Sequence, residues 1–306
     1  MRYWAGITDF NWFRNLAEIR PDEVNFWQPG ATRPCRIDPG TPFVFKLRGR
    51  DVIAGVGFFM QFTILPIFLA WDAFGRKNGT FTLKELRDAI GALRPNPVSV
   101  GDKIGCNILT QPCLFEEHDW IPVRSIWRPG IRRGRYFDTE EGDGRSLWDA
   151  IRERISARQN LADAVPAASR QPGRYYLAKA RLGQGTFRTL ILDTYERRCA
   201  VTGEKTLPTL EAAHIKAHAS HGPSCIENGL LLRADLHRLF DKRYVTVDPD
   251  MKFVVSDKIH EHFDNGKEYR RLHGIALRVP RQPELRPSPE FITWHNQRFE
   301  QFDGTE

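Results

Sequence analysis

The sequence predicts an α+β protein with two domains, and three observations support this. The chain has 306 residues, which is enough for two domains that each bury a core. The first half alternates β-type runs with Gly, Pro and charged turns, whereas residues 209–241 read as strand, loop, strand and helix. Between them, residues 164–173 are small residues and prolines, typical of a linker. We therefore predict domains at 1–165 and 166–306.

Mixed strands and short helices in the N-terminal domain favour a compact β-barrel. The β-type runs are Tyr3–Thr8, Pro42–Leu47, Val52–Phe62 and Asp102–Thr110. Helical patterns cover Asn11–Glu18, Thr82–Ala92 and Ser146–Asp163. Thr82 is the expected N-cap of the second helix, with Glu85 three residues later. The third helix has an apolar stripe that comprises Leu147, Ile151, Ile155 and Leu161.

The most informative segment runs from Thr209 to Asp241. An extended run ends at His214, a polar loop follows, and Asn228-Gly229 is a turn pair that leads into a return strand. Residues 234–241 then read as a short helix. On such a helix His237 and Asp241, four residues apart, share one face.

These residue types suit metal-assisted hydrolysis of a phosphodiester. The imidazole of His214, with an ordinary pKa near ~6.5, can deprotonate water. A divalent cation held by His237 and Asp241 can polarise a phosphoryl oxygen and stabilise the leaving oxygen. Asn228 can hold the His214 ring in register through an amide hydrogen bond. A lone histidine is more often a core residue, so the prediction depends on the joint pattern.

The order His, Asn, His in strand, loop, strand and helix resembles the HNH nuclease family, which has a ββα-metal fold. The resemblance implies catalytic roles for His214 as base, Asn228 as orienting residue and His237 as metal ligand with Asp241. It also implies Mg²⁺ or Mn²⁺ as the metal. The family often places another ligand directly before the base, where this chain has Ala213. Water or Glu211 is the expected substitute.

Two upstream segments, Arg181–Arg188 and Tyr195–Gly203, also resemble a bacterial HNH subfamily without structural zinc. Many relatives carry two Cys-x-x-Cys pairs, but here Cys199 and Cys225 stand alone, so a four-thiolate zinc site cannot form. We expect no structural zinc and read Cys199 as a small core residue. Gly183-Gln184-Gly185 is a weak phosphate-loop candidate and more often simply begins a helix.

Basic residues gather just before the proposed nuclease site. The net charge is +7 and the pI about 9.3, which is compatible with a polyanionic partner. Residues 170–205 carry eight basic and three acidic side chains. From these we expect DNA phosphate contacts by Arg181, Arg188, Arg197 and Arg198. The alternative is a solvated basic face.

Aromatic residues are concentrated in the N-terminal half, which holds seven of the eight tryptophans. Most should pack in the core. Trp27, Trp71 and Phe74 lie beside polar groups in turn-like sequence, where they can stack on a base.

The segments Arg2–Thr8, Phe43–Leu47 and Gly55–Phe59 are similar to EVE domains of the PUA superfamily, small β-barrels that hold a flipped modified base. A base reader followed by an HNH module resembles modification-dependent restriction endonucleases. The resemblance implies cleavage of double-stranded DNA that contains 5-methylcytosine or 5-hydroxymethylcytosine. A pocket that recovers the cost of base extrusion only through the 5-substituent would spare plain cytosine.

Two alternatives remain open. The N-terminal domain can read another mark, such as phosphorothioate, or a short sequence. Alternatively, the protein binds nucleic acid without cutting it, with a degenerate HNH fold, and Ala213 favours this reading.

Other features limit the location and assembly of the protein. The apolar run Val56–Ala70 is interrupted by Gln61 and Pro66, so we read it as a buried strand pair and expect no membrane association. Unpatterned cysteines and the absence of a signal-like start favour the cytoplasm. A homodimer is a possible assembly, since one site cuts one strand. Residues 248–306 are expected to brace the nuclease domain without chemistry of their own.

Overall fold

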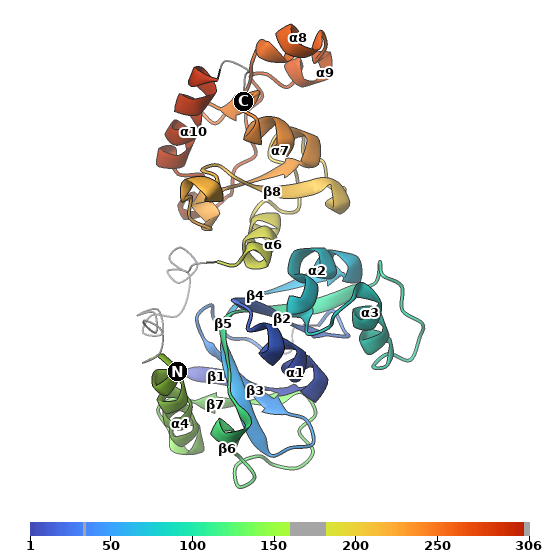
Figure 1. Ribbon diagram of the computed structural model, residues 1–306, viewed down its shortest axis with the longest axis vertical. Coiled ribbons are helices and arrows are strands. Elements are labelled where there is room, and N and C mark those ends of the chain that lie inside the picture. Colours follow the sequence, from blue (N-terminus) through green and yellow to red (C-terminus); the bar gives the residue numbers. More distant parts are fainter. Residues whose placement is uncertain (33–34, 160–181, 303–306) are drawn as a thin grey trace. The chain divides into compact units, whose positions relative to one another are not determined.

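The computed structural model describes residues 1–32, 35–159 and 182–302. The chain divides into two compact units, Met1–Thr186 and Phe187–Glu306 (Figure 1). The expected domain boundary near residue 165, the helical residue Leu161 and the candidate phosphate contact Arg181 all lie outside the described residues. No helix within the described ranges is both long and apolar enough to cross a membrane.

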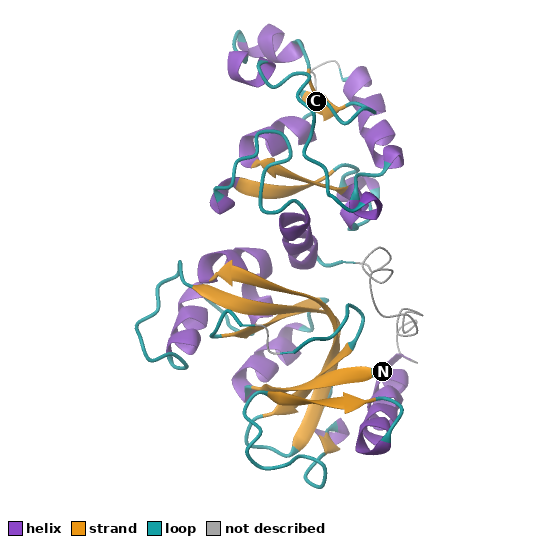
Figure 2. Cartoon of the chain, turned by 180° about the vertical axis from the view of Figure 1, so that it is seen from behind, coloured by secondary structure: helices purple, strands orange, loops and turns teal. Residues whose placement is uncertain are grey.

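The first unit is built on one seven-stranded sheet, drawn in orange in Figure 2. Its strands are β1 (Arg2–Thr8), β2 (Glu23–Gln28), β3 (Pro42–Leu47), β4 (Val52–Pro66), β5 (Lys103–Leu114), β6 (Ile121–Pro122) and β7 (Gly134–Asp138). The strand order is β2-β5-β4-β3-β1-β7, and β6 pairs with β4. β1 and β3 are parallel, whereas the other pairs are antiparallel.

The predicted α+β class is confirmed, and the predicted barrel is not found within the described ranges. Among the described strands, none of the pairings joins β2 to β7, so no closed barrel is found. Long β4 bridges the unit, since it pairs with β3, β5 and β6 and shifts register at two places against β5. Such irregularities bend a strand.

Alternating side chains of the sheet pack into two separate hydrophobic cores. Tyr3 and Ala5 of β1 and Val44 of β3 lie in one core, while Trp4 and Phe43 lie in the other. This is the two-residue period of a strand covered on both faces. Helix α4 packs on the first core and helix α1 on the second.

The helices of the first unit agree with the expected patterns in most places. They are α1 (Phe10–Ile19), α2 (Ile67–Phe74), α3 (Leu83–Gly91) and α4 (Gly142–Gln159). Thr82 caps α3 as predicted, because its hydroxyl accepts a hydrogen bond from the Glu85 amide at 3.1 Å. The predicted stripe of α4 is buried at Leu147, Ile151 and Ile155.

Three sequence-based interpretations were wrong in this unit. Trp71 and Phe74, read as lying in turn-like sequence, belong to helix α2. Asn25–Gln28, read as turn-like, belongs to strand β2, which pairs with β5 along its whole length. The apolar run Val56–Ala70, read as a strand pair, is one strand that continues into helix α2. Pairing with a distant strand supplies the hydrogen bonds of β2, and local composition cannot reveal that partner.

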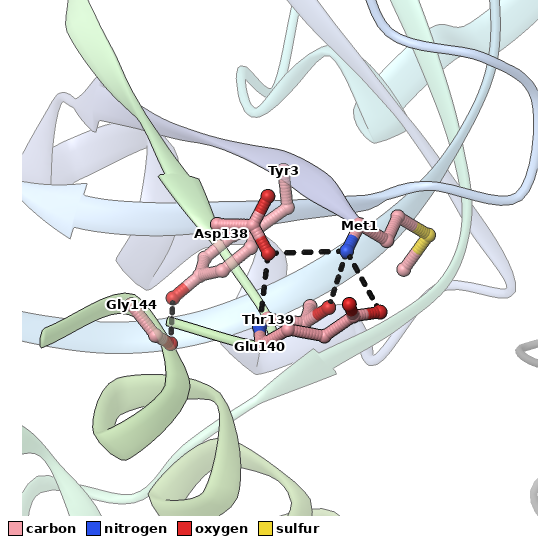
Figure 3. A network of polar contacts seen from close by, with 6 residues as sticks. All are labelled: Met1, Tyr3, Asp138, Thr139, Glu140 and Gly144. Carbon is pink, nitrogen blue, oxygen red and sulfur yellow. Dashed lines mark hydrogen bonds and ion pairs between the residues drawn. The ribbon is translucent and has the colours of Figure 1, made fainter. Parts of the chain in front are cut away.

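The end of the sheet is held by contacts of β1 with β7 and α4 (Figure 3). The Met1 ammonium donates to Asp138 Oδ1 at 3.1 Å and to Thr139 Oγ1 at 2.8 Å. The Tyr3 hydroxyl donates to the Gly144 carbonyl at 2.8 Å. These bonds fix the start of α4 against the first core.

The second unit contains two small hairpins and several helices. The strands are β8 (Leu210–His214), β9 (Gly229–Arg233), β10 (Val245–Val247) and β11 (Phe253–Val255). The helices are α6 (Gln184–Thr194), α7 (Ala234–Asp241), α8 (Lys258–Phe263), α9 (Lys267–Arg270) and α10 (Pro289–Gln301), of which α6 begins in the first unit. The predicted strand, loop, strand and helix of residues 209–241 are thus confirmed as β8, β9 and α7.

The start of α6 explains the Gly-Gln-Gly segment. The fully buried carboxylate of Glu23 accepts hydrogen bonds from the amides of Gly185 at 2.9 Å and Thr186 at 2.8 Å. A methyl group on Gly183 would lie 2.3 Å from Glu23 Cδ. A side-chain carboxylate therefore already occupies the helix amides that a phosphate would need, and the segment begins a helix.

Candidate active site and base pocket

The β8–β9 hairpin and α7 position the three residues of the predicted motif. In the hairpin, His214 pairs with Gly229, which directly follows Asn228 in the sequence. Helix α7 follows β9 without a gap and carries His237. Leu236 and Phe240 of α7 are buried, so the helix packs on one face and leaves His237 half-buried.

His214 is held by an aromatic ring from α6. Its imidazole stacks on Phe187 with a centroid distance of 3.9 Å and an angle of 11° between the planes. Its Nε2 lies 3.4 Å from Ser224 Oγ in the loop between the strands. Phe187 is 1% exposed, so the stacking partner cannot move easily.

Asn228 acts on the loop and not on the histidine ring. Its Oδ1 accepts from the Lys216 amide at 2.7 Å, and its Nδ2 donates to the carbonyls of Lys216 at 3.0 Å and Pro223 at 2.8 Å. Both amide donors are thereby used. In this described part of the chain, the expected hydrogen bond from Asn228 to the His214 ring is therefore absent, and the asparagine instead binds the backbone of Lys216, two residues after His214. The asparagine side chain is fully buried.

His237 lies between two carboxylates. Its Nδ1 is 2.7 Å from Glu211 Oε2, and its Nε2 is 3.3 Å from Asp241 Oδ2. Burial raises the pKa of the Asp241 carboxyl, with His237 opposing the shift and Glu211 adding to it. Ala213, by contrast, is fully buried. The structure thus brings together His237, Asp241 and the alternative ligand Glu211.

The chemistry of these donors fits a divalent cation, since carboxylate oxygens and an imidazole nitrogen bind Mg²⁺ or Mn²⁺. The three side chains lie close together, but the two carboxylates face opposite ring nitrogens of His237. Within residues 1–32, 35–159 and 182–302, no group of three or more His, Cys, Asp or Glu side chains is placed to hold a metal ion. Cys199 is buried, as expected of a small core residue.

The candidate phosphate contacts have different environments. Arg197 pairs with Asp193 at 3.2 Å. Arg188 lies on α6 and is half-buried, as is Arg198, which follows the helix. The carboxylate beside Arg197 reduces its availability to DNA.

The first unit contains a cavity of about 310 Å³ that is rich in aromatic side chains. Trp27 lines it, as predicted for base binding, and its indole Nε1 donates to the Asn78 carbonyl at 2.9 Å. Trp71 and Phe74 are not part of its lining, and Phe74 is only 3% exposed because it packs in the core. The structure therefore does not bring these two residues together with Trp27.

Several residues of the cavity were not identified from the sequence. Its aromatic walls include Trp4, Trp12 and Phe26, and its polar lining includes Asp9, Gln28, Arg48, Arg132 and Arg133. Asp9 Oδ1 caps α1 by accepting from the amides of Asn11 and Trp12. The sequence signal was the aromatic spacing in residues 4–27, but only strand pairing shows that these rings meet.

Comparison with known proteins finds a family match within the second unit. Residues 199–248 match the family model of the HNH endonuclease. This match covers the hairpin, the loop and α7. The chain therefore carries an HNH endonuclease domain and is a DNA-hydrolysing enzyme. No curated protein is similar in sequence.

Two solved structures are similar at a low level. One is the "Modification dependent TagI restriction endonuclease", with 13% identity over 93% of this chain and 79% of that chain and a TM-score of 0.30. The other is a point mutant of the ZmASCH protein from Zymomonas mobilis, with 9% identity over 50% of this chain and 96% of that chain and a TM-score of 0.30.

Proposed function

We propose that this enzyme is a modification-dependent DNA endonuclease in which the first unit reads a modified cytosine and the HNH domain cuts. The observation that carries the nuclease part is the match of residues 199–248 together with the contacts around His214 and His237. Retained side chains at all three motif positions argue against a degenerate domain that only binds DNA.

In this proposal His214 removes the proton from the attacking water. Phe187 keeps the imidazole plane fixed, and Asn228 fixes the backbone that follows the base. His237 and Asp241 would hold the divalent metal, Mg²⁺ or Mn²⁺, which when bound stabilises charge on the phosphate and the leaving oxygen. When Nδ1 of His237 carries the proton, Glu211 accepts its hydrogen bond, and Nε2, on the Asp241 side of the ring, can bind the metal.

The reader part is supported by the cavity of the first unit. A volume of about 310 Å³, aromatic walls and an acceptor at Asp9 suit an extruded base with an exocyclic amine. We propose that Trp27 stacks on the extruded base. We assign no base-binding role to Trp71 and Phe74, which do not line the cavity. The same proposal includes a barrel-like reader of the EVE and PUA type and 5-methylcytosine or 5-hydroxymethylcytosine as the mark. It also includes a cytoplasmic location and a homodimer for double-strand cleavage.

The test is digestion of one phage genome prepared with plain, methylated or hydroxymethylated cytosine. Wild type with Mg²⁺ or Mn²⁺ should cut a modified genome and spare the plain one. EDTA or His214→Ala should abolish cutting, with a loss of at least about 10³-fold in rate. Trp27→Ala should reduce preference for the modified genome while the His214 site stays intact.

Each part of the proposal can fail separately. Equal cutting of the three genomes would remove the reader function and favour a sequence or another mark, such as phosphorothioate. Cleavage that persists in both EDTA and His214→Ala would overturn the assignment of base and metal.

A further inference from the structure

Two cationic side chains contact the indole ring of Trp294 on α10. Arg298 Cζ is 3.7 Å from the ring centroid, and Lys216 Nζ is 5.9 Å from it. Arg298 lies four residues further along α10, whereas Lys216 comes from the loop after β8. Stacking on one rigid ring restricts two long side chains that would otherwise be free to move in solvent.

These two cations have no carboxylate partner within the described part of the chain. The remaining side-chain bond of Arg298 goes to the Trp294 carbonyl at 3.3 Å, and Lys216 forms no ion pair there. Two like charges held near one ring repel each other, and a bound anion reduces that repulsion. The positive potential also reaches the core, because Arg243 and Arg298 add to the burial that lowers the pKa of His295.

The position of Lys216 connects this cationic pair to the nuclease site. Lys216 is the second residue after His214, and its amide and carbonyl are both held by the Asn228 side chain. The backbone that presents the ammonium group is therefore the same segment that follows the candidate base. Because Lys216 is only two residues from His214, we expect a phosphate that binds to Lys216 to belong to the DNA near the scissile linkage.

We propose that Lys216, Trp294 and Arg298 form a binding site for a DNA backbone phosphate that neighbours the scissile linkage. Guanidinium and ammonium donors match phosphate oxygens, and such contacts set the register of a duplex without reading its sequence. This inference rests on the proposed function in that the anion belongs to DNA. It also gives the C-terminal segment a role in binding beyond the bracing expected from its sequence.

The experiment measures binding of an unmodified duplex of about 20 base pairs at several salt concentrations, in EDTA and in a His214→Ala background. Lys216→Gln and Arg298→Gln should each weaken binding at low salt and reduce the salt slope of log K by about one. Arg271→Gln, which removes an exposed cation that pairs with Glu268, is the matched control and should change neither. Circular dichroism verifies that each variant is folded.

The outcomes separate this inference from the proposed function. Unchanged slopes for Lys216→Gln and Arg298→Gln, or a loss equal to that of Arg271→Gln, would overturn the phosphate site. If the two variants show reduced salt slopes but the wild-type protein does not cut DNA, the phosphate site stands and the proposed function is wrong. If wild type cuts DNA but the salt slopes of the two variants are unchanged, the proposed function stands and the phosphate site is wrong.

Discussion

At the scale of single residues, the two histidines of the site are controlled in different ways. His214 is fixed by the flat face of Phe187, which restrains the ring plane but does not select a tautomer. His237 is fixed by two carboxylates, because Glu211 lies 2.7 Å from Nδ1 and Asp241 lies 3.3 Å from Nε2. A base must gain and lose a proton during the reaction, whereas a ligand must keep one nitrogen unprotonated.

Glu211→Gln should weaken Mn²⁺ binding by about 10- to 100-fold, because an amide is a poorer acceptor for the His237 proton. Calorimetric titration of the DNA-free protein with MnCl₂ measures this directly. Glu261→Gln, at an exposed position on α8, is the control and should leave the affinity unchanged. An unaltered affinity in Glu211→Gln would show that Glu211 does not support the ligand.

Phe187→Leu should keep the fold but lower the cleavage rate by about 10-fold or more, since a misplaced base loses rate steeply. Leu190→Met on the same helix serves as the packing control, since Leu190 is 5% exposed. Equal losses in the two variants would assign Phe187 to packing alone.

At the scale of elements, the sequence predicted those whose pattern is local. Residues 234–241 have helical spacing, and α7 covers that range, with His237 and Asp241 on one face. Strand β2 was missed because Asn25 and the following Pro29-Gly30 look like a turn, while its hydrogen bonds come from β5. The Phe187–His214 and Glu211–His237 contacts join residues that lie more than 20 positions apart, so no periodicity could predict them.

The start of α6 provides a prediction for this scale. Gly183→Ala should destabilise the protein by about 1–3 kcal/mol, because the added methyl group collides with the buried Glu23 carboxyl. Urea unfolding measures the change. Gly91→Ala is the control, since its methyl group would meet only Val98 Cγ2 at 3.9 Å. A Gly183→Ala protein as stable as this control would contradict the close approach of Glu23.

At the scale of the whole molecule, one buried histidine ties stability to pH. His295 is 6% exposed, stacks on Phe240 at 3.8 Å and has Nε2 3.1 Å from the Phe240 carbonyl. Burial lowers its pKa from 6.5 to about 4. Because the unfolded chain binds the proton more readily than the folded one, protonation below pH ~6.5 favours unfolding.

The free energy of unfolding should therefore fall by about 2 kcal/mol between about pH 7 and about pH 5 through this group alone. Urea unfolding followed by circular dichroism at each pH measures the slope. Subtracting the same series for His295→Gln isolates the histidine, because other groups titrate equally in both proteins. Parallel curves for the two proteins would refute the neutral, buried state of His295.

The pairing of β1 has a consequence for synthesis of the chain. Residues of β1 pair with residues 43–47 on one side and 134–138 on the other, so one edge of this early strand stays open until residue 138 has been translated. None of the β8–β9 hairpin has then been made. Because domains fold as units while the ribosome still elongates the chain, the first sheet can be completed before the HNH histidines are translated. The order of translation therefore gives the first unit time to fold before a nuclease site can form.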